Sequence, residues 1–148
     1  MADTSQDPLV GYKFALELQG KLSGFFTNVS GIGSETEVIR EKVIGPNGEA
    51  IEKAIPGRTT WTPITMKRGV TDNMDVWNWR KEVTDGKVES ARCNASIIAF
   101  NQENQEVARW NLERCWPSKV TGPEMDAAST NYLVEDITIV HEGMDRVS

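Results

Sequence analysis

The chain has 148 residues, of which 26% are charged and 39% are hydrophobic, and its formal net charge is −6. These values are typical of a folded protein with its own core, and they exclude a disordered chain. The negative charge and the lack of a Lys and Arg cluster disfavour direct binding to nucleic acid or to an anionic membrane. We therefore expect one domain that spans residues 1–148.

Alternating apolar and polar residues predict the first strands. From Tyr12 to Leu18 every second side chain is apolar, as in a half-buried strand. A second short strand is expected over residues 23–29, a glycine turn over 30–33, and a third strand over 36–44.

Residues 44–60 are predicted to form a long protruding loop. Strong turn signals lie at 46–48 (PNG) and 56–57 (PG), and the apolar residues Ile51 and Ile55 lie between them. Long loops in small domains tend to be functional, so these side chains are candidates for a contact with another molecule.

A helix is predicted over residues 72–85, directly after a strand. Asp72 is a favourable N-cap residue, and Gly86 suits the position that follows a helix C-terminus. At helical spacing, one stripe of the segment is apolar and holds Val76, Trp79 and Val83. The segment has no nucleophile and no base, so we expect it to pack against the strands rather than to carry chemistry.

Three further strands are expected, over residues 90–100, 105–116 and 133–141, with a polar hairpin turn between the first two. Seven or eight strands and one helix, mostly joined by hairpins, indicate a mainly β fold. The expected architecture is an antiparallel two-sheet sandwich or barrel.

Several of these strands lack the purely polar outer face that a small monomeric sandwich usually has. On one face of the strand over 90–100, polar Asn94 and Ser96 are followed by Ile98 and Phe100. This pattern favours assembly through sheet faces and edges. The alternative is that the helix and the loops cover these faces within one subunit.

No residue pattern indicates a catalytic, metal or cofactor site, and we expect no enzyme. Cys93, Cys115 and His141 lack the spacing of zinc ligands, and no nucleophile motif is present. The two cysteines lie in strand-like segments and are expected to be small reduced core residues, and a disulfide is possible only if their strands are neighbours. The N-terminus has no basic and apolar signal regions, which indicates synthesis in the cytoplasm.

Five motifs follow one another along the chain: DPLVGYKFALELQG, FFTNVSGIGSETEV, ITMKRGVTDNMDVWNW, ARWNLERCWPSKVTGP and VEDITIVHEGM. In this order they resemble the tail tube protein family of contractile phage tails, and in particular the inner-tube subunits of extracellular contractile injection systems. Arg114-Cys115 departs from the family, which often has Asn-Ala before the Trp-Pro pair. The resemblance covers nearly the whole chain.

The resemblance implies a structural subunit, not an enzyme, with a two-sheet barrel-like fold and one flanking helix. Six subunits would close a ring, and rings would stack into a hollow tube that conducts protein cargo or phage DNA. The implied partners are other copies of the chain, a surrounding sheath, a baseplate with its spike, and a tube terminator. The tube would assemble in the bacterial cytoplasm and become part of a released particle or virion.

Two sets of site residues follow as hypotheses. The candidates for contact between rings lie in the predicted loop and are Asn47, Gly48, Glu49, Ile51 and Ile55. The candidates for the channel wall are Glu17 and Glu37, chosen from strand alternation, where negative charge would repel acidic cargo.

Three alternatives stay open at this stage. The chain could be a tube-initiator subunit that adapts the tube to the spike and baseplate, or a type VI secretion tube protein. In a different class, it could be a monomeric β-sandwich module that binds a ligand such as a sugar through Trp61 or Trp110.

Overall fold

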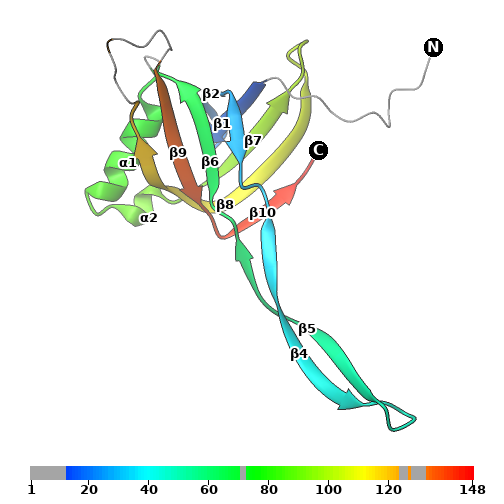
Figure 1. The fold of residues 1–148 in the computed structure, drawn as a ribbon. Coiled ribbons are helices and arrows are strands. Elements are labelled where there is room, and N and C mark those ends of the chain that lie inside the picture. The colour runs from blue at the N-terminus through cyan, green and yellow to red at the C-terminus, as the bar shows by residue number, and fades with distance from the viewer. Residues whose placement is uncertain (1–12, 71–72, 124–126, 128–132) are drawn as a thin grey trace, which may run out of the picture.

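The computed structural model describes residues 13–70, 73–123, 127 and 133–148, which form ten strands and two short helices (Figure 1). In chain order they are β1 (Lys13–Leu18), β2 (Lys21–Phe26), β3 (Asn28–Ser30), β4 (Ser34–Ile44), β5 (Ala50–Trp61), β6 (Ile64–Gly69), α1 (Asp75–Thr84), α2 (Val88–Ala91), β7 (Cys93–Phe100), β8 (Glu106–Thr121), β9 (Val134–Val140) and β10 (Gly143–Arg146). All strand pairs among them are antiparallel. The prediction of a mainly β, antiparallel fold is confirmed. Tyr12, the predicted start of the first strand, lies outside the described residues.

Eight strands form one sheet that curls into a barrel. Their order is β2-β1-β7-β8-β9-β6-β3, and β10 pairs with β8 beside this path. The segment 21–30 contains both end strands, and the Thr27 N–H donates a hydrogen bond of 2.9 Å to the Lys67 carbonyl. This bond joins the end of β2 to β6, so that the ribbon of strands closes on itself (Figure 1).

The long strand β8 belongs to both halves of the barrel. Its first part pairs with β7 up to Cys115, and its second part pairs with β9 from Trp116 onward. Just before this junction, Arg114 has a positive φ of 47°, and the register with β7 shifts between Cys93 and Ala95. A bulge of this kind bends a strand, which lets one strand pass from one half of the barrel to the other.

Alternate residues of the barrel strands point inward and meet a face of α1. The fully buried aliphatic side chains include Leu16, Ile97, Leu112, Ile137 and Ile139. Val76 and Trp79 of α1 join the same cluster, which places the helix against the barrel (Figure 1). The period of two in the strands and the helical spacing in α1 therefore bury side chains in one common core.

The observed helix α1 is shorter than the predicted range 72–85. Its N-cap residue Met74 makes no side-chain cap, but the Asn73 Oδ1 accepts a hydrogen bond of 2.8 Å from the Asp75 N–H. Asp72, the predicted N-cap, lies outside the described residues. The short helix α2 was not predicted, and the Trp79 indole N–H donates to the Ala91 carbonyl at 2.7 Å, which ties α2 to α1.

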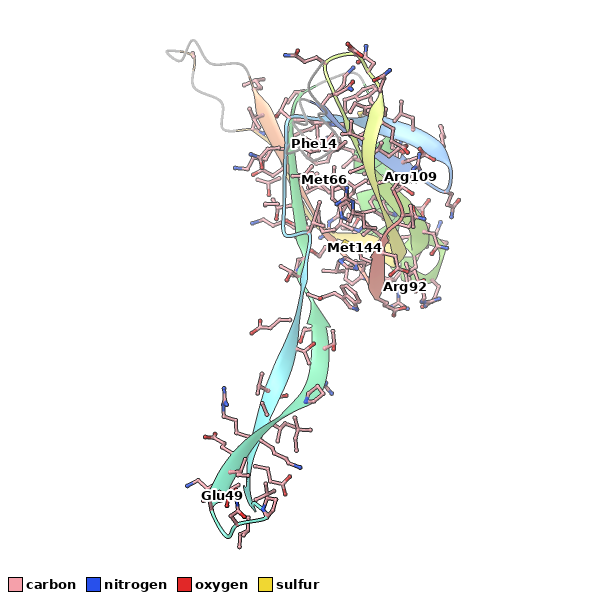
Figure 2. All side chains as sticks on the ribbon, turned by 90° about the vertical axis from the view of Figure 1, so that its right-hand side faces the viewer. Phe14, Glu49, Met66, Arg92, Arg109 and Met144 are labelled. Atoms are coloured by element: carbon pink, nitrogen blue, oxygen red, sulfur yellow. The ribbon has the colours of Figure 1, made fainter. Side chains whose placement is uncertain are left out.

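Strands β4 and β5 form a separate two-stranded sheet, here called the arm, that projects far from the barrel (Figures 1 and 2). The sequence predicted a loop over 44–60, whereas Ala50–Trp61 is a strand paired along β4. Pro56 and Gly57 suggested a turn, but they lie where the β4–β5 register shifts. Proline is tolerated at such a bulge because no ladder hydrogen bond is required from it. Nearly every side chain of the arm is exposed, so it shows no periodic burial pattern.

Candidate assembly surfaces

The arm presents aliphatic side chains on one of its two faces. Ile39 lies opposite Ile55, and Val43 lies opposite Ile51, with the pair Glu41 and Lys53 between them. We call these four aliphatic residues the apolar strip. Its three isoleucines are 37% to 48% exposed. The strip is therefore two aliphatic pairs separated by one charged pair, and aliphatic side chains grouped on a projecting element are typical of a protein contact site.

The opposite face of the arm carries polar residues and two exposed aliphatic ones, since Val38 is 54% exposed and Ile44 is 82% exposed. Arg40 lies opposite Ala54, and Ile44 lies opposite Ala50. An ion pair of 3.9 Å joins Arg40 and Glu52 across this face, with both side chains more than half exposed. Such an exposed pair contributes little stability. Both faces of the arm therefore expose aliphatic side chains, and the apolar strip differs in that its aliphatic residues lie opposite one another on the two strands.

The tip of the arm is a tight turn. The Gly45 N–H donates to the Glu49 carbonyl at 2.8 Å, and the Gly48 N–H donates to the Gly45 carbonyl at 3.0 Å. Gly48 has a φ of +81°, a conformation that a side chain would strain. Glu49 is labelled at this end in Figure 2.

The structure brings all five residues proposed for contact between rings to the arm. Three of them, residues 47–49, lie at the tip, while Ile51 and Ile55 lie on the apolar strip. Their contact with another ring stays a prediction. Sequence reasoning missed Ile39 and Val43, which complete the strip, because only strand pairing shows that they share a face with the two predicted isoleucines.

The two residues proposed for the channel wall lie on different parts of the molecule. Glu17 is on β1 of the barrel, where its carboxylate is 3.5 Å from Arg109 of β8. Arg109 also pairs with Glu106 at 2.9 Å, and the hydrogen bond to Glu106 raises the pKa of Arg109. Glu37 lies on β4 of the arm, next to the register shift. The two carboxylates therefore do not form one surface within a subunit.

Arg68 and Trp77, both from the stretch ITMKRGVTDNMDVWNW, meet in a buried polar network. The Arg68 Nε is 2.6 Å from the Glu135 Oε1, and the Trp77 Nε1–H donates to the Glu135 Oε2 at 2.7 Å. The Arg68 Nη2 also donates to the Asn73 carbonyl at 3.1 Å. The guanidinium lies 5.3 Å from the ring centre of Phe26. These contacts hold the start of α1 to strands β6 and β9, so the motif serves the fold.

The two cysteines are direct neighbours on β7 and β8 and are free thiols. The Cys115 Sγ–H donates to the Cys93 carbonyl at 3.1 Å. The side-chain hydrogen bond with Cys93 and burial both raise the pKa of Cys115, while the same bond lowers the pKa of Cys93. The expected small core role fits Cys115, which is fully buried, better than Cys93, which is half-buried.

The remaining candidate groups have structural partners. His141 has its Nδ1 3.2 Å from the Gly143 carbonyl and its ring 5.6 Å from that of Trp61, and burial lowers its pKa. Trp110 is half-buried beneath the guanidinium of Arg146, at 5.7 Å. The two tryptophans considered for sugar binding therefore each lie against a side chain of the same chain.

The described part of the chain has no cluster of three or more His, Cys, Asp or Glu side chains placed to hold a metal ion. Over the same residues, no helix is long and apolar enough to cross a bilayer.

Comparison with known proteins identifies one family. The family model described as T4-like virus tail tube protein gp19 matches residues 10–145 of this chain. No curated protein matches the chain.

Solved structures with the same fold come from contractile injection systems. A chain of the PVC sheath-tube complex in the extended state, an extracellular contractile injection system, has a TM-score of 0.80 and 22% identity, with 98% of this chain and 95% of that chain covered. A chain in the structure of the tube-terminating cap of the anti-feeding prophage has a TM-score of 0.79 and 22% identity, with 100% of this chain and 96% of that chain covered. Hcp1 from Flavobacterium johnsoniae is more distant, with a TM-score of 0.53, 16% identity, and 90% and 93% covered. At these identities the similarity establishes the shared fold.

Proposed function

The chain belongs to the T4-like virus tail tube protein family, and on this premise we propose that it is the repeating subunit of the inner tube of a contractile injection system. Six copies form a ring, and rings stack into a rigid hollow tube. Contraction of an outer sheath drives this tube through the envelope of a target cell. The subunit has a structural and not an enzymatic role.

The observation that carries this proposal is the arm. A two-stranded sheet that leaves the barrel and exposes an apolar strip has no partner among the described residues of its own chain. Its eleven-residue strand β4 spans about 35 Å, so the arm carries its tip well away from the barrel. Two different head-to-tail contacts are then used. The contact within a ring closes into a ring, whereas the contact between rings repeats along the tube without closing.

The tip residues 47–49 and the strip residues Ile51 and Ile55 are the proposed contact between rings. Burying aliphatic side chains that are partly exposed in the single subunit stabilises the stack by the hydrophobic effect. The turn at the tip is closed by two backbone hydrogen bonds, so the arm loses little conformational entropy when it docks.

Glu17 is the proposed channel-wall residue of the barrel. It lies on β1 in register with Ser96 of β7, on a strand face that also carries Lys13. A wall with paired charges, such as Glu17 with Arg109, presents no strongly basic surface on which acidic cargo would bind. Glu37 lies on the arm. It is therefore proposed to line the channel only at places where the arm of one ring extends to the channel wall of another ring.

The proposed partners are a sheath protein around the tube, the baseplate and spike at one end, and a terminator at the other. Support comes from the similar chains, one of which belongs to a sheath-tube complex, one to a tube-terminating cap and one to a baseplate. The proposed cargo of the lumen is protein or phage DNA. We expect the tube to assemble in the bacterial cytoplasm and to leave within a phage-like particle or virion.

Negative-stain electron microscopy of the purified protein tests the function directly. Hollow tubes or rings with a central hole are the expected result. Long homogeneous polymers support a main-tube subunit, whereas discrete rings that stop growing support the tube-initiator role. A protein that stays monomeric both alone and with baseplate proteins present would contradict the proposal.

A paired substitution tests the role of the apolar strip. Ile51→Glu with Ile55→Glu places two charges on the strip and is expected to shorten the tubes and lower their yield. The matched control is Ala50→Glu with Ala54→Glu, which adds the same charges to the opposite face of the same strand. Unchanged tube length and yield in the isoleucine variant would remove the strip from the contact between rings.

A further inference from the structure

The barrel contains a pair of cysteines that the proposed tube function does not use. Cys93 and Cys115 lie directly opposite each other in the β7–β8 register, where the two strands run side by side (Figure 1). Both are free thiols. Directly opposed residues of antiparallel strands have side chains on the same face and Cα atoms about 4.5–5.5 Å apart. This separation lies inside the range of about 4.4–6.8 Å that a disulfide needs.

The two cysteine side chains meet at the core but differ in exposure. Cys115 is fully buried and belongs to the core cluster, whereas Cys93 is half-buried and packs against that cluster. The Cys115 Sγ–H donates to the Cys93 carbonyl at 3.1 Å, which holds the buried thiol beside its neighbour. A bond between the two sulfur atoms therefore requires rotation of the side chains and no rearrangement of the strands.

Cys93 is open to small reagents through a cavity between β2, α1 and α2. The cavity has a volume of about 260 Å³, and its wall includes Cys93, Asn78, Glu82 and Ser90. Such a space is large enough for several molecules of the size of water, and hydrogen peroxide is only slightly larger. Because Cys115 is fully buried, a reagent that enters this cavity meets Cys93 first.

The surroundings of the two thiols favour the thiolate of Cys93. The hydrogen bond from the Cys115 side chain lowers the pKa of Cys93, and this effect outweighs the opposing effects of burial and of the Glu82 carboxylate. The same hydrogen bond and burial raise the pKa of Cys115. Since the thiolate is the nucleophile in thiol chemistry, Cys93 is the more reactive of the two.

We propose that Cys93 and Cys115 form an oxidation site, in which a hydroperoxide such as hydrogen peroxide oxidises Cys93 and Cys115 then closes a disulfide between β7 and β8. The Cys93 thiolate attacks one peroxide oxygen, the O–O bond breaks, and the leaving hydroxide takes a proton from solvent. The product is a sulfenic acid on Cys93. The Cys115 sulfur then attacks the Cys93 sulfur, and the S–O bond breaks. The second hydroxide takes the Cys115 thiol proton, so the peroxide is reduced to water and both sulfur atoms are oxidised.

The disulfide joins the strands where β8 passes from one half of the barrel to the other. Strand β8 leaves β7 after Cys115 and pairs with β9 from Trp116 onward. The bond links residues that are 22 positions apart, and closing such a loop restricts the unfolded chain and so stabilises the folded one. Disulfides of this kind persist outside a reducing cytoplasm. The site is a property of the single subunit, so it goes beyond the proposed tube function and does not depend on it.

Oxidation of the folded protein by hydrogen peroxide tests the site. Reduced protein, freed of reductant, is treated with peroxide and digested without a reductant. The expected product is a chain that has lost the mass of two hydrogen atoms, in which the peptides that contain Cys93 and Cys115 are linked. The melting temperature should rise by about 5–10 °C, and it should return to its starting value after reduction.

Two single variants test the separate roles of the cysteines. In Cys115→Ala, the oxidised Cys93 has no neighbouring thiol. Dimedone, which traps sulfenic acids, should therefore label Cys93 about tenfold more than in the wild type. In Cys93→Ala, the buried Cys115 should stay unlabelled. Neither variant should gain melting temperature on oxidation, with its own reduced form as the reference.

Several results would overturn this inference. Both thiols could stay free in folded, peroxide-treated protein, or Cys93 could proceed to a sulfinic acid without linking to Cys115. Disulfides that join only different chains, or that form only after unfolding in urea, would have the same meaning. Equal dimedone labelling of Cys93 in the wild type and in Cys115→Ala would remove Cys115 from the reaction. Tube formation is not measured in these experiments, so the tube function stands or fails separately.

Discussion

Removing the charge of Glu135 should destabilise the subunit strongly. In Glu135→Gln, Arg68 keeps its buried positive charge but loses the partner at 2.6 Å, while the amide oxygen can still accept from Trp77. Loss of one partner of a buried ion pair costs about 3–5 kcal/mol, and the retained hydrogen bonds place this variant near the lower limit, at about 3 kcal/mol. That is a large fraction of the ~5–15 kcal/mol that stabilises a typical domain.

The assay is urea unfolding followed by tryptophan fluorescence at several protein concentrations, because assembly adds to apparent stability by mass action. The matched control is Lys67→Gln on the neighbouring, exposed position of β6, which should change the free energy of unfolding by less than about 0.5 kcal/mol. The double variant Arg68→Met with Glu135→Gln should lose less than the sum of the two single variants, because no charge is left unpaired.

A loss below about 1 kcal/mol for Glu135→Gln would refute this reasoning. It would mean that water reaches Arg68 and solvates its charge, so that the ion pair behaves as an exposed one. Strict additivity in the double variant would lead to the same conclusion.

Three further outcomes are expected. Gly24→Ala should destabilise the subunit by about 1–3 kcal/mol in the same urea assay. Gly24 has a φ of +143°, and a Cβ there would lie 2.5 Å from Arg68 Nη1. A variant as stable as the wild type would contradict this expectation. Under native conditions, mass spectrometry should find Cys93 alkylated before Cys115, whose pKa is raised by its hydrogen bond to Cys93 and by burial; equal rates would contradict it. Burial lowers the folded-state pKa of His141 below its usual 6.5, so the unfolded chain binds the proton more readily and stability should fall as the pH drops below about 6.5. His141→Gln should remove this part of the pH dependence, and an unchanged slope would exclude His141 as its source.

Much of the fold could be predicted from local patterns. Alternation from Phe14 to Leu18 and around Ile97 marks strands that the structure contains, because the faces that carry Leu16 and Ile97 pack on the core and their period of two survives in the sequence. The helix was found for a similar reason, since Val76 and Trp79 repeat at helical spacing and enter the core.

The arm shows where such patterns fail. Strand β5 has no buried face, so exposure leaves no periodicity, and Pro56 and Gly57 give turn signals that the register shift accommodates. The short helix α2 was missed because a single turn carries too little pattern to detect.

The amino-acid sequence by itself determined the class of the fold, the family and the presence of apolar residues in the segment 44–60, because each depends on residue types and their local order. Only the tertiary structure decided which of these residues share a surface. It paired Ile51 and Ile55 with Val43 and Ile39, joined Arg68 to Glu135 across 67 residues, and separated Glu17 from Glu37. The physical reason is that strand register and barrel closure are set by the packing of distant segments together, and this information is not contained in any one of them.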